Sequence, residues 1–95
     1  MRHAELRPTL HLFVCANRRE AGSPLGPGCG ARGDAVYTEL KRGVAARGAH
    51  VSIWVTKTQC LGVCPVSGAT VAVYPSGLVI AEVEPTDAPA LLDGV

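Results

Sequence analysis

The pattern of hydrophobic and polar residues divides the first half of the chain into a strand and a helix. Residues 10–14 (LHLFV) form a short apolar run rich in strand-forming residues, which predicts a buried first strand that ends at Cys15. A helix is predicted to begin after Asp34, a favourable N-cap residue, and to stop at Gly48. Its apolar residues recur at helical spacing and are expected to face the core: Val36, Tyr37, Leu40 and Val44.

A second strand is predicted over residues 50–55, where apolar and less apolar positions alternate. A strand, a helix and a strand in this order favour a parallel pair joined by a right-handed crossover. Parallel strands end at the same edge of a sheet. We therefore expect Cys15, at the end of the first strand, to meet Cys60, in the loop after the second strand.

The last third of the chain has the pattern of a hairpin followed by a short helix. Residues 69–74 and 78–83 are rich in strand-forming residues, and residues 75–77 (PSG) between them favour a tight turn. Residues 85–87 (PTD) can begin a last short helix that buries Ala88, Leu91 and Leu92. The predicted fold is one α/β domain over residues 1–95, with a four-stranded mixed sheet built as β-α-β, then a β-hairpin and a short C-terminal helix.

A long glycine-rich segment, residues 16–33, surrounds Cys29 and is predicted to be a loop. Loops of this length are unusual in compact domains and tend to be functional. Glycine lets the main chain approach a bound group closely and point N–H groups at it. A mobile linker is the alternative interpretation, and the position of Cys29 between Gly28 and Gly30 favours the binding role.

Composition and charge exclude several classes of partner. The formal net charge is +1 and the basic residues are scattered, so the chain lacks the clustered positive charge that binds nucleic acid or a membrane surface. Residues 1–9 lack the apolar core of a secretory signal, and no apolar run reaches membrane-spanning length. We therefore expect a cytoplasmic protein that binds neither nucleic acid nor a membrane.

The chemistry of the chain centres on four cysteines: Cys15, Cys29, Cys60 and Cys64. In a reducing compartment, four cysteines in a short chain indicate metal or redox chemistry, whereas in a secreted protein two disulfides would be the simpler interpretation. Structural zinc sites usually have two closely spaced pairs, and here only Cys60 and Cys64 are close. The spacings of plant-type ferredoxins, Rieske centres and thioredoxin dithiols are absent. No constellation of general base and nucleophile accompanies the cysteines, so we do not expect an enzyme.

Two segments, together with the order of the elements, indicate a family. Residues 60–65 (CLGVCP), followed by residues 71–77 (VAVYPSG), closely resemble the thioredoxin-like [2Fe-2S] ferredoxins, small bacterial proteins related to the Shethna-type ferredoxins. The resemblance extends from about residue 10 to residue 92. It implies a thioredoxin-like fold, a [2Fe-2S] cluster and the function of a one-electron carrier between a reductase and an acceptor enzyme. Members of this family are often homodimers, so the resemblance implies a homodimer as well.

The same resemblance implies the cluster ligands. By position they are Cys15, Cys29, Cys60 and Cys64, with the first two on one iron and the last two on the other. We expect Gly30 and Gly62 to admit main-chain N–H bonds to the sulfur atoms. Two other functions fit the same cysteines: an accessory or interaction module that holds zinc or iron, and a redox sensor that uses the same cluster.

Overall fold

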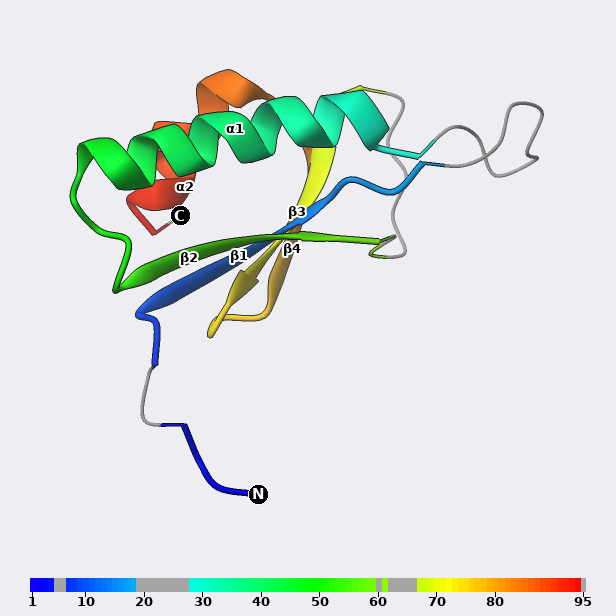
Figure 1. Ribbon diagram of the computed structural model, residues 1–95. Coiled ribbons are helices and arrows are strands. Elements are labelled where there is room, and N and C mark those ends of the chain that lie inside the picture. Colours follow the sequence, from blue (N-terminus) through cyan, green and yellow to red (C-terminus); the bar gives the residue numbers. More distant parts are fainter. Residues whose placement is uncertain (5–6, 19–27, 60, 62–66, 95) are drawn as a thin grey trace.

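The computed structural model describes residues 1–4, 7–18, 28–59, 61 and 67–94. Two helices lie together on one face of a four-stranded sheet, and no described element covers the other face (Figure 1). We call this second face the open face. In chain order the elements are β1 (Leu10–Cys15), α1 (Gly30–Ala46), β2 (Ile53–Thr58), β3 (Ala69–Tyr74), β4 (Leu78–Val83), a 3-10 turn (Pro85–Asp87) and α2 (Ala88–Leu92).

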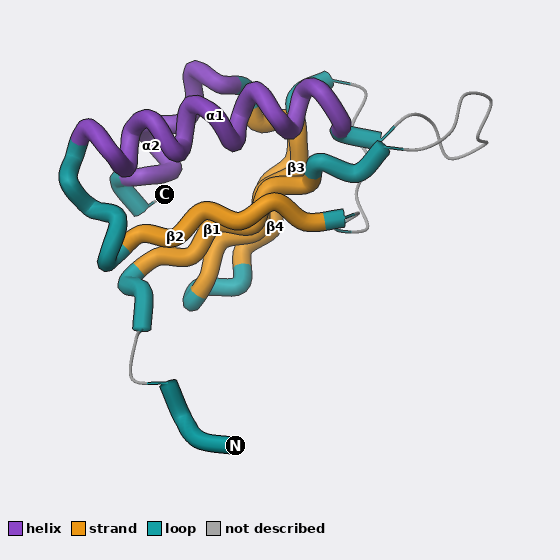
Figure 2. Tube along the Cα trace, in the orientation of Figure 1, coloured by secondary structure: helices purple, strands orange, loops and turns teal. Residues whose placement is uncertain are grey.

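The strands follow the order β2-β1-β3-β4 across the sheet and form one layer beneath the helices (Figure 2). β1 and β2 are parallel, with Cys15 opposite Thr58. β3 runs antiparallel to β1, with Val71 opposite Val14, and β4 runs antiparallel to β3. The predicted β-α-β unit, hairpin and mixed four-stranded sheet are therefore confirmed.

The core lies between the helices and the sheet. Alternate residues of β1 and β3, such as Leu12, Val14 and Val71, are fully buried against Val36 and Leu40 of α1. Burying a side chain of this size stabilises the fold by about 1.5–3 kcal/mol. The apolar stripe predicted for the helix thus faces the core, except that Tyr37 is only partly buried at its edge.

α1 begins earlier than the sequence indicated, so the prediction that Asp34 is its N-cap was wrong. Cys29 occupies the N-cap position and the helix starts at Gly30. Because Gly33 lacks a Cβ atom, the first turn can lie directly against the end of β1; a Cβ on Gly33 would be 1.9 Å from the carbonyl oxygen of Cys15. Residues 30–33, which we predicted to belong to the glycine-rich loop, are therefore helical. A residue larger than glycine at position 33 would prevent the helix and the strand from lying this close together.

β2 begins later than the predicted strand, residues 50–55. Gly48 ends α1 as expected, with a φ of +60°, and the chain then makes a turn before the strand. The main-chain N–H groups of Ser52 and Ile53 both donate to the carbonyl oxygen of Ala49, at 3.0 and 2.9 Å. Val51 lies in this turn and is exposed, so its apolar character does not belong to the strand pattern.

α2 closes the core from the C-terminal side. It buries Ala88, Leu91 and Leu92, as predicted, and packs beside α1. Gly43 of α1 faces it, and a Cβ on Gly43 would be 2.4 Å from the Cδ1 atom of Leu92. Within the parts of the chain that the structure describes, neither helix is long and apolar enough to cross a membrane.

Candidate metal centre

Cys15 and Cys29 come together where β1 ends and α1 begins. Cys15 is the last residue of β1, Cys29 is the N-cap of α1, and the two are only 0% and 1% exposed. Their side chains are hydrogen-bonded to each other, and both are free thiols. The structure therefore brings two of the four predicted site residues into contact, although thirteen residues separate them in the sequence.

The surroundings of Cys29 act on its thiol in opposite directions. Burial raises the pKa of Cys29, and the neighbouring Cys15 thiol also raises it. A main-chain hydrogen bond from Thr70 and the positive charge of Arg32 both lower the pKa of Cys29, but it remains above its ordinary value. In the metal-free protein the Cys29 thiol therefore keeps its proton, and a metal ion that binds the sulfur would displace it.

Thr70 is a contributor to this site that sequence reasoning missed. It is fully buried in β3, beside Val71, which pairs with Val14 next to Cys15. Gly30 is a position that we expect to admit main-chain N–H bonds to sulfur, and its own N–H group donates to the carbonyl oxygen of Asn17 at 3.0 Å. The spacing of the cysteines does not predict the role of Thr70, because the antiparallel pairing of β3 with β1 brings Thr70 to Cys29.

Cys60, Cys64 and Gly62 lie outside the described residues. The described chain on both sides of them borders the thiol pair. On one side, the N–H group of Ala16 donates to the carbonyl oxygen of Thr58, the last residue of β2, at 3.0 Å. On the other side, β3 begins beside the end of β1. The segment with the second cysteine pair thus leaves and re-enters the described structure at the edge of the sheet where Cys15 lies.

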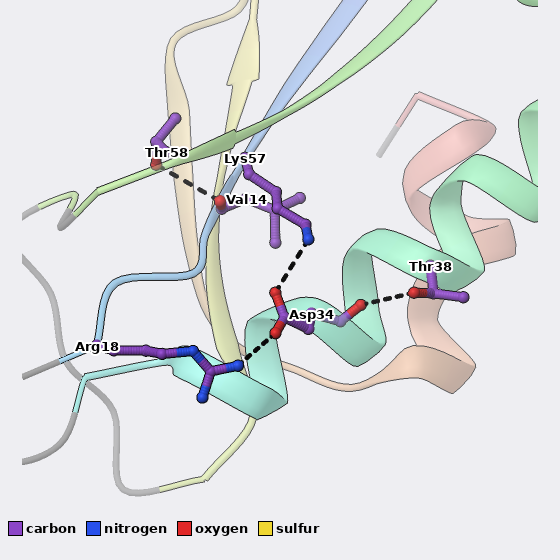
Figure 3. A network of polar contacts seen from close by, with 6 residues as sticks. All are labelled: Val14, Arg18, Asp34, Thr38, Lys57 and Thr58. Atoms are coloured by element: carbon purple, nitrogen blue, oxygen red, sulfur yellow. Dashed lines mark hydrogen bonds and ion pairs between the residues drawn. The ribbon is translucent and has the colours of Figure 1, made fainter.

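A charged network on the surface links the elements around the thiol pair. The carboxylate of Asp34, in α1, lies between Arg18 and Lys57 (Figure 3), with distances of 2.5 Å to Arg18 Nη2 and 3.2 Å to Lys57 Nζ. Arg18 follows β1 and Lys57 belongs to β2, so this one carboxylate joins three elements. Its hydrogen bond with Lys57 is the main reason why the pKa of Asp34 is lowered, and Arg18 lowers it further.

The side chains at this site that could bind a metal ion suit a metal that prefers sulfur ligands. Two thiols meet in a buried place, a main-chain N–H group is directed at one of them, and a guanidinium group lies nearby. Thiolate sulfur is the usual ligand of iron-sulfur clusters and of structural zinc. Among the residues that the structure describes, no group of three or more His, Cys, Asp or Glu could hold a metal ion. A complete site here therefore needs ligands from the remaining parts of the chain.

Comparison with solved structures places the fold among the thioredoxin-like [2Fe-2S] ferredoxins. The wild-type ferredoxin of this type from Aquifex aeolicus matches with a TM-score of 0.78 and 27% identity, over 92% of this chain and 84% of that one. Another structure of a thioredoxin-like [2Fe-2S] ferredoxin from Aquifex aeolicus matches with a TM-score of 0.77 and 26% identity, over 92% of this chain and 79% of that one. A cysteine-to-serine variant gives the same TM-score and identity over 88% and 83% of the two chains. No family model and no curated protein matches the sequence. The predicted thioredoxin-like fold is confirmed.

Proposed function

We propose that this chain, which shares the fold of the thioredoxin-like [2Fe-2S] ferredoxins, is a one-electron carrier with a single [2Fe-2S] cluster. The observation that supports this most directly is the buried, hydrogen-bonded pair of Cys15 and Cys29 at the edge of the sheet. The likeness to the Aquifex aeolicus ferredoxin over 92% of the chain points to the same cofactor. Two buried thiols side by side, without a disulfide, are the arrangement expected of ligands that share one iron.

The proposed ligands are Cys15 and Cys29 on one iron and Cys60 and Cys64 on the other. Support for the second pair comes from its place in the sequence, between β2 and β3, since both strands border β1 at the end that holds Cys15. A metal centre at this edge would join the end of β1, the start of α1 and the connection between β2 and β3.

The chain itself would supply ligands, burial and charge. When bound, a [2Fe-2S] cluster accepts one electron from a donor protein and passes it to an acceptor. The burial of Cys15 and Cys29 keeps water from their sulfur atoms, while the Thr70 N–H group and the Arg32 charge stabilise negative charge at Cys29. We propose a reductase and an acceptor enzyme as its partners and the cytoplasm as its location, with no enzymatic reaction of its own.

Anaerobic purification tests this proposal. We expect a red-brown protein with about two iron and about two sulfide per chain, which becomes paramagnetic when dithionite reduces it by one electron. Metal analysis, visible absorption and electron paramagnetic resonance give the answer. A colourless protein that holds one zinc per chain would contradict the carrier function and favour a zinc-binding accessory module instead.

A cluster-based redox sensor is the second candidate and needs a separate measurement. A sensor must bind its partner with different affinity in its two oxidation states. The carrier proposal expects both states to cycle repeatedly with little change in affinity for the partners. Pull-downs with the oxidised and the dithionite-reduced protein, followed by titration of any captured protein, distinguish the two functions.

We further propose that the protein forms a homodimer through the open face of the sheet. This face presents Tyr74 and Val79, which are 47% and 52% exposed. It also has an apolar hollow of about 510 Å³ lined by Pro8, His11, Phe13, Leu61, Ala72, Tyr74 and Pro75. A second copy of the chain that packed on this face would remove these side chains from water.

A further inference from the structure

Two arginines lie next to the turn that carries Cys29. Arg32 Nη2 donates to the carbonyl oxygen of Gly28 at 3.0 Å. The Arg18 side chain passes close to Gly30, so that a Cβ on Gly30 would be 3.4 Å from Arg18 Cγ and from Arg18 Nη1. Each arginine therefore lies at one of the two glycines that flank Cys29.

The two guanidinium groups differ in their surroundings. The Arg18 side chain is 65% exposed and is paired with the Asp34 carboxylate, which also accepts Lys57. The bond between Arg32 and Gly28 is partly buried. Solvent and counterions screen a partly buried charge less than an exposed one. Arg32 is also the arginine whose positive charge acts on the Cys29 thiol.

From this geometry we propose that Arg32 tunes the reduction potential of the centre, because its guanidinium group, fixed on the carbonyl oxygen next to Cys29, supplies positive charge beside the sulfur ligand. The inference rests on the proposed function. A cluster with four thiolate ligands becomes more negative by one charge when it is reduced, and a fixed positive charge nearby favours the reduced form. Arg32 should therefore raise the potential.

The potentials of three variants of the holoprotein test this role. Arg32→Gln removes the charge but keeps a side chain that can donate to the Gly28 carbonyl oxygen, whereas Arg32→Lys keeps the charge without the planar guanidinium group. Arg42→Gln is the matched control: it removes the same charge from the same helix, at a side chain that is 71% exposed and paired with Glu39. Position 42 lies about 15 Å further along the helix axis, beyond the screening length in physiological salt.

We expect Arg32→Gln to decrease the equilibrium constant for one-electron reduction by about threefold to tenfold, where tenfold corresponds to about 59 mV. Arg32→Lys and Arg42→Gln should stay close to wild type. Redox titration with dithionite, followed by visible absorption and electron paramagnetic resonance, measures each potential. An unchanged potential in Arg32→Gln, or an equal decrease in Arg42→Gln, would overturn the proposal.

Loss of the cluster in a variant is also informative. If Arg32→Gln fails to hold iron while Arg32→Lys holds it at the wild-type potential, charge at this position is required, which supports the proposal. If Arg32→Lys also fails, the guanidinium shape and not the charge is needed, and the proposal is wrong. A wild-type protein without any cluster refutes the carrier function itself, whereas a red-brown wild type with insensitive variants refutes only the role of Arg32.

Discussion

At the scale of single residues, the surroundings of the Cys29 sulfur atom depend both on the position of Cys29 in the chain and on the pairing of strands in the fold. Its place at the start of α1 puts the thiol beside Cys15, and pairing of β3 with β1 adds the Thr70 N–H group. Burial alone would favour a neutral thiol. The N–H bond and the Arg32 charge reduce this penalty, so the site can hold a thiolate once a metal ion is bound.

Cys64 is the residue whose replacement tests the second ligand pair. We expect Cys64→Ala to lose the cluster, since a [2Fe-2S] centre with an alanine in place of one thiolate lacks a ligand. Iron per chain and visible absorption measure the loss. The control is Ser67→Ala, an exposed position three residues later, which should keep wild-type iron. A Cys64→Ala protein with unchanged colour would contradict the assignment.

His11 gives a prediction on pH that is independent of the metal site. It lies on the open face, stacked on Phe13 with ring centroids 4.0 Å apart, and its Nε2 atom is 2.8 Å from Thr56 Oγ1. Burial lowers the pKa of His11 below its usual 6.5. The folded state therefore binds the proton less tightly than the unfolded chain, so this contribution to stability is fully present above the unfolded pKa and is lost as pH falls through the folded one.

NMR titration of the His11 ring should give a midpoint below 6.5 in the wild type. Phe13→Ala exposes the ring, and we expect the His11 midpoint to move up towards its usual value because less desolvation opposes the charged form. An unshifted His11 midpoint in Phe13→Ala would show that burial against Phe13 is not the cause.

At the scale of elements, the decisive contact is that of α1 with the end of β1. The helix starts early and lies close to the strand because Gly33 allows its first turn to rest on the Cys15 carbonyl group. This contact sets the position of Cys29 relative to Cys15. The geometry of the thiol pair therefore depends on packing of main chain against main chain, in addition to the side chains themselves.

Gly33→Ala should therefore affect both stability and the metal site. The new methyl group would lie 1.9 Å from the Cys15 carbonyl oxygen, which forces the helix and strand apart. We expect the free energy of unfolding to fall by about 1–3 kcal/mol, the usual cost of overpacking. Iron per chain should fall as well, because Cys29 moves relative to Cys15. Denaturant unfolding and metal analysis measure the two effects.

Gly43→Ala, in the same helix, is the matched control. Its new methyl group would meet the end of the flexible Leu92 side chain, which can move aside. Alanine is also the better helix former by about 1 kcal/mol. We expect a small change in stability and wild-type iron content. If Gly43→Ala lost as much iron as Gly33→Ala, the close contact at Cys15 would not be the reason for the loss.

At the scale of the whole molecule, the two faces of the sheet differ in how far they are covered. The helices cover one face of the sheet, and among the described elements none covers the other (Figure 1). The exposed apolar side chains on the open face are what the proposed homodimer would bury. The proposed metal site lies at the edge of the sheet, so a dimer through the open face would leave the Arg18, Asp34 and Lys57 side of the site available to a redox partner.

Val79→Glu tests the dimer. Val79 pairs with Ala72, next to the apolar hollow, and a buried carboxylate there would cost much more than the valine contact gains. We expect the dimer to weaken by more than about tenfold, or about 1.4 kcal/mol, with unchanged circular dichroism and iron content. Analytical ultracentrifugation over a concentration series measures the dissociation constant of the dimer.

Val51→Glu, in the exposed turn before β2, is the control and should dimerise as the wild type does. A wild-type protein that is monomeric in this experiment would refute the proposed dimer.

The local pattern of the sequence was sufficient for much of the fold. Alternating and continuous apolar runs located β1, β3, β4 and the last helix, because burial on one face of an element imposes that pattern on the residues themselves. The stripe of α1 was found for the same reason. The four cysteines indicated metal or redox chemistry, and the resemblance of residues 60–65 and 71–77 to the thioredoxin-like [2Fe-2S] ferredoxins implied which kind.

The tertiary structure alone decided where elements begin and which residues meet. The early start of α1 depends on the approach of Gly33 to Cys15, and the late start of β2 depends on the turn at Ala49. The roles of Thr70 and Arg32 near Cys29 likewise follow from strand pairing and from the fold of the turn. These contacts join positions that are distant in the sequence or involve main-chain atoms, and neither kind leaves a periodic trace in the amino acids.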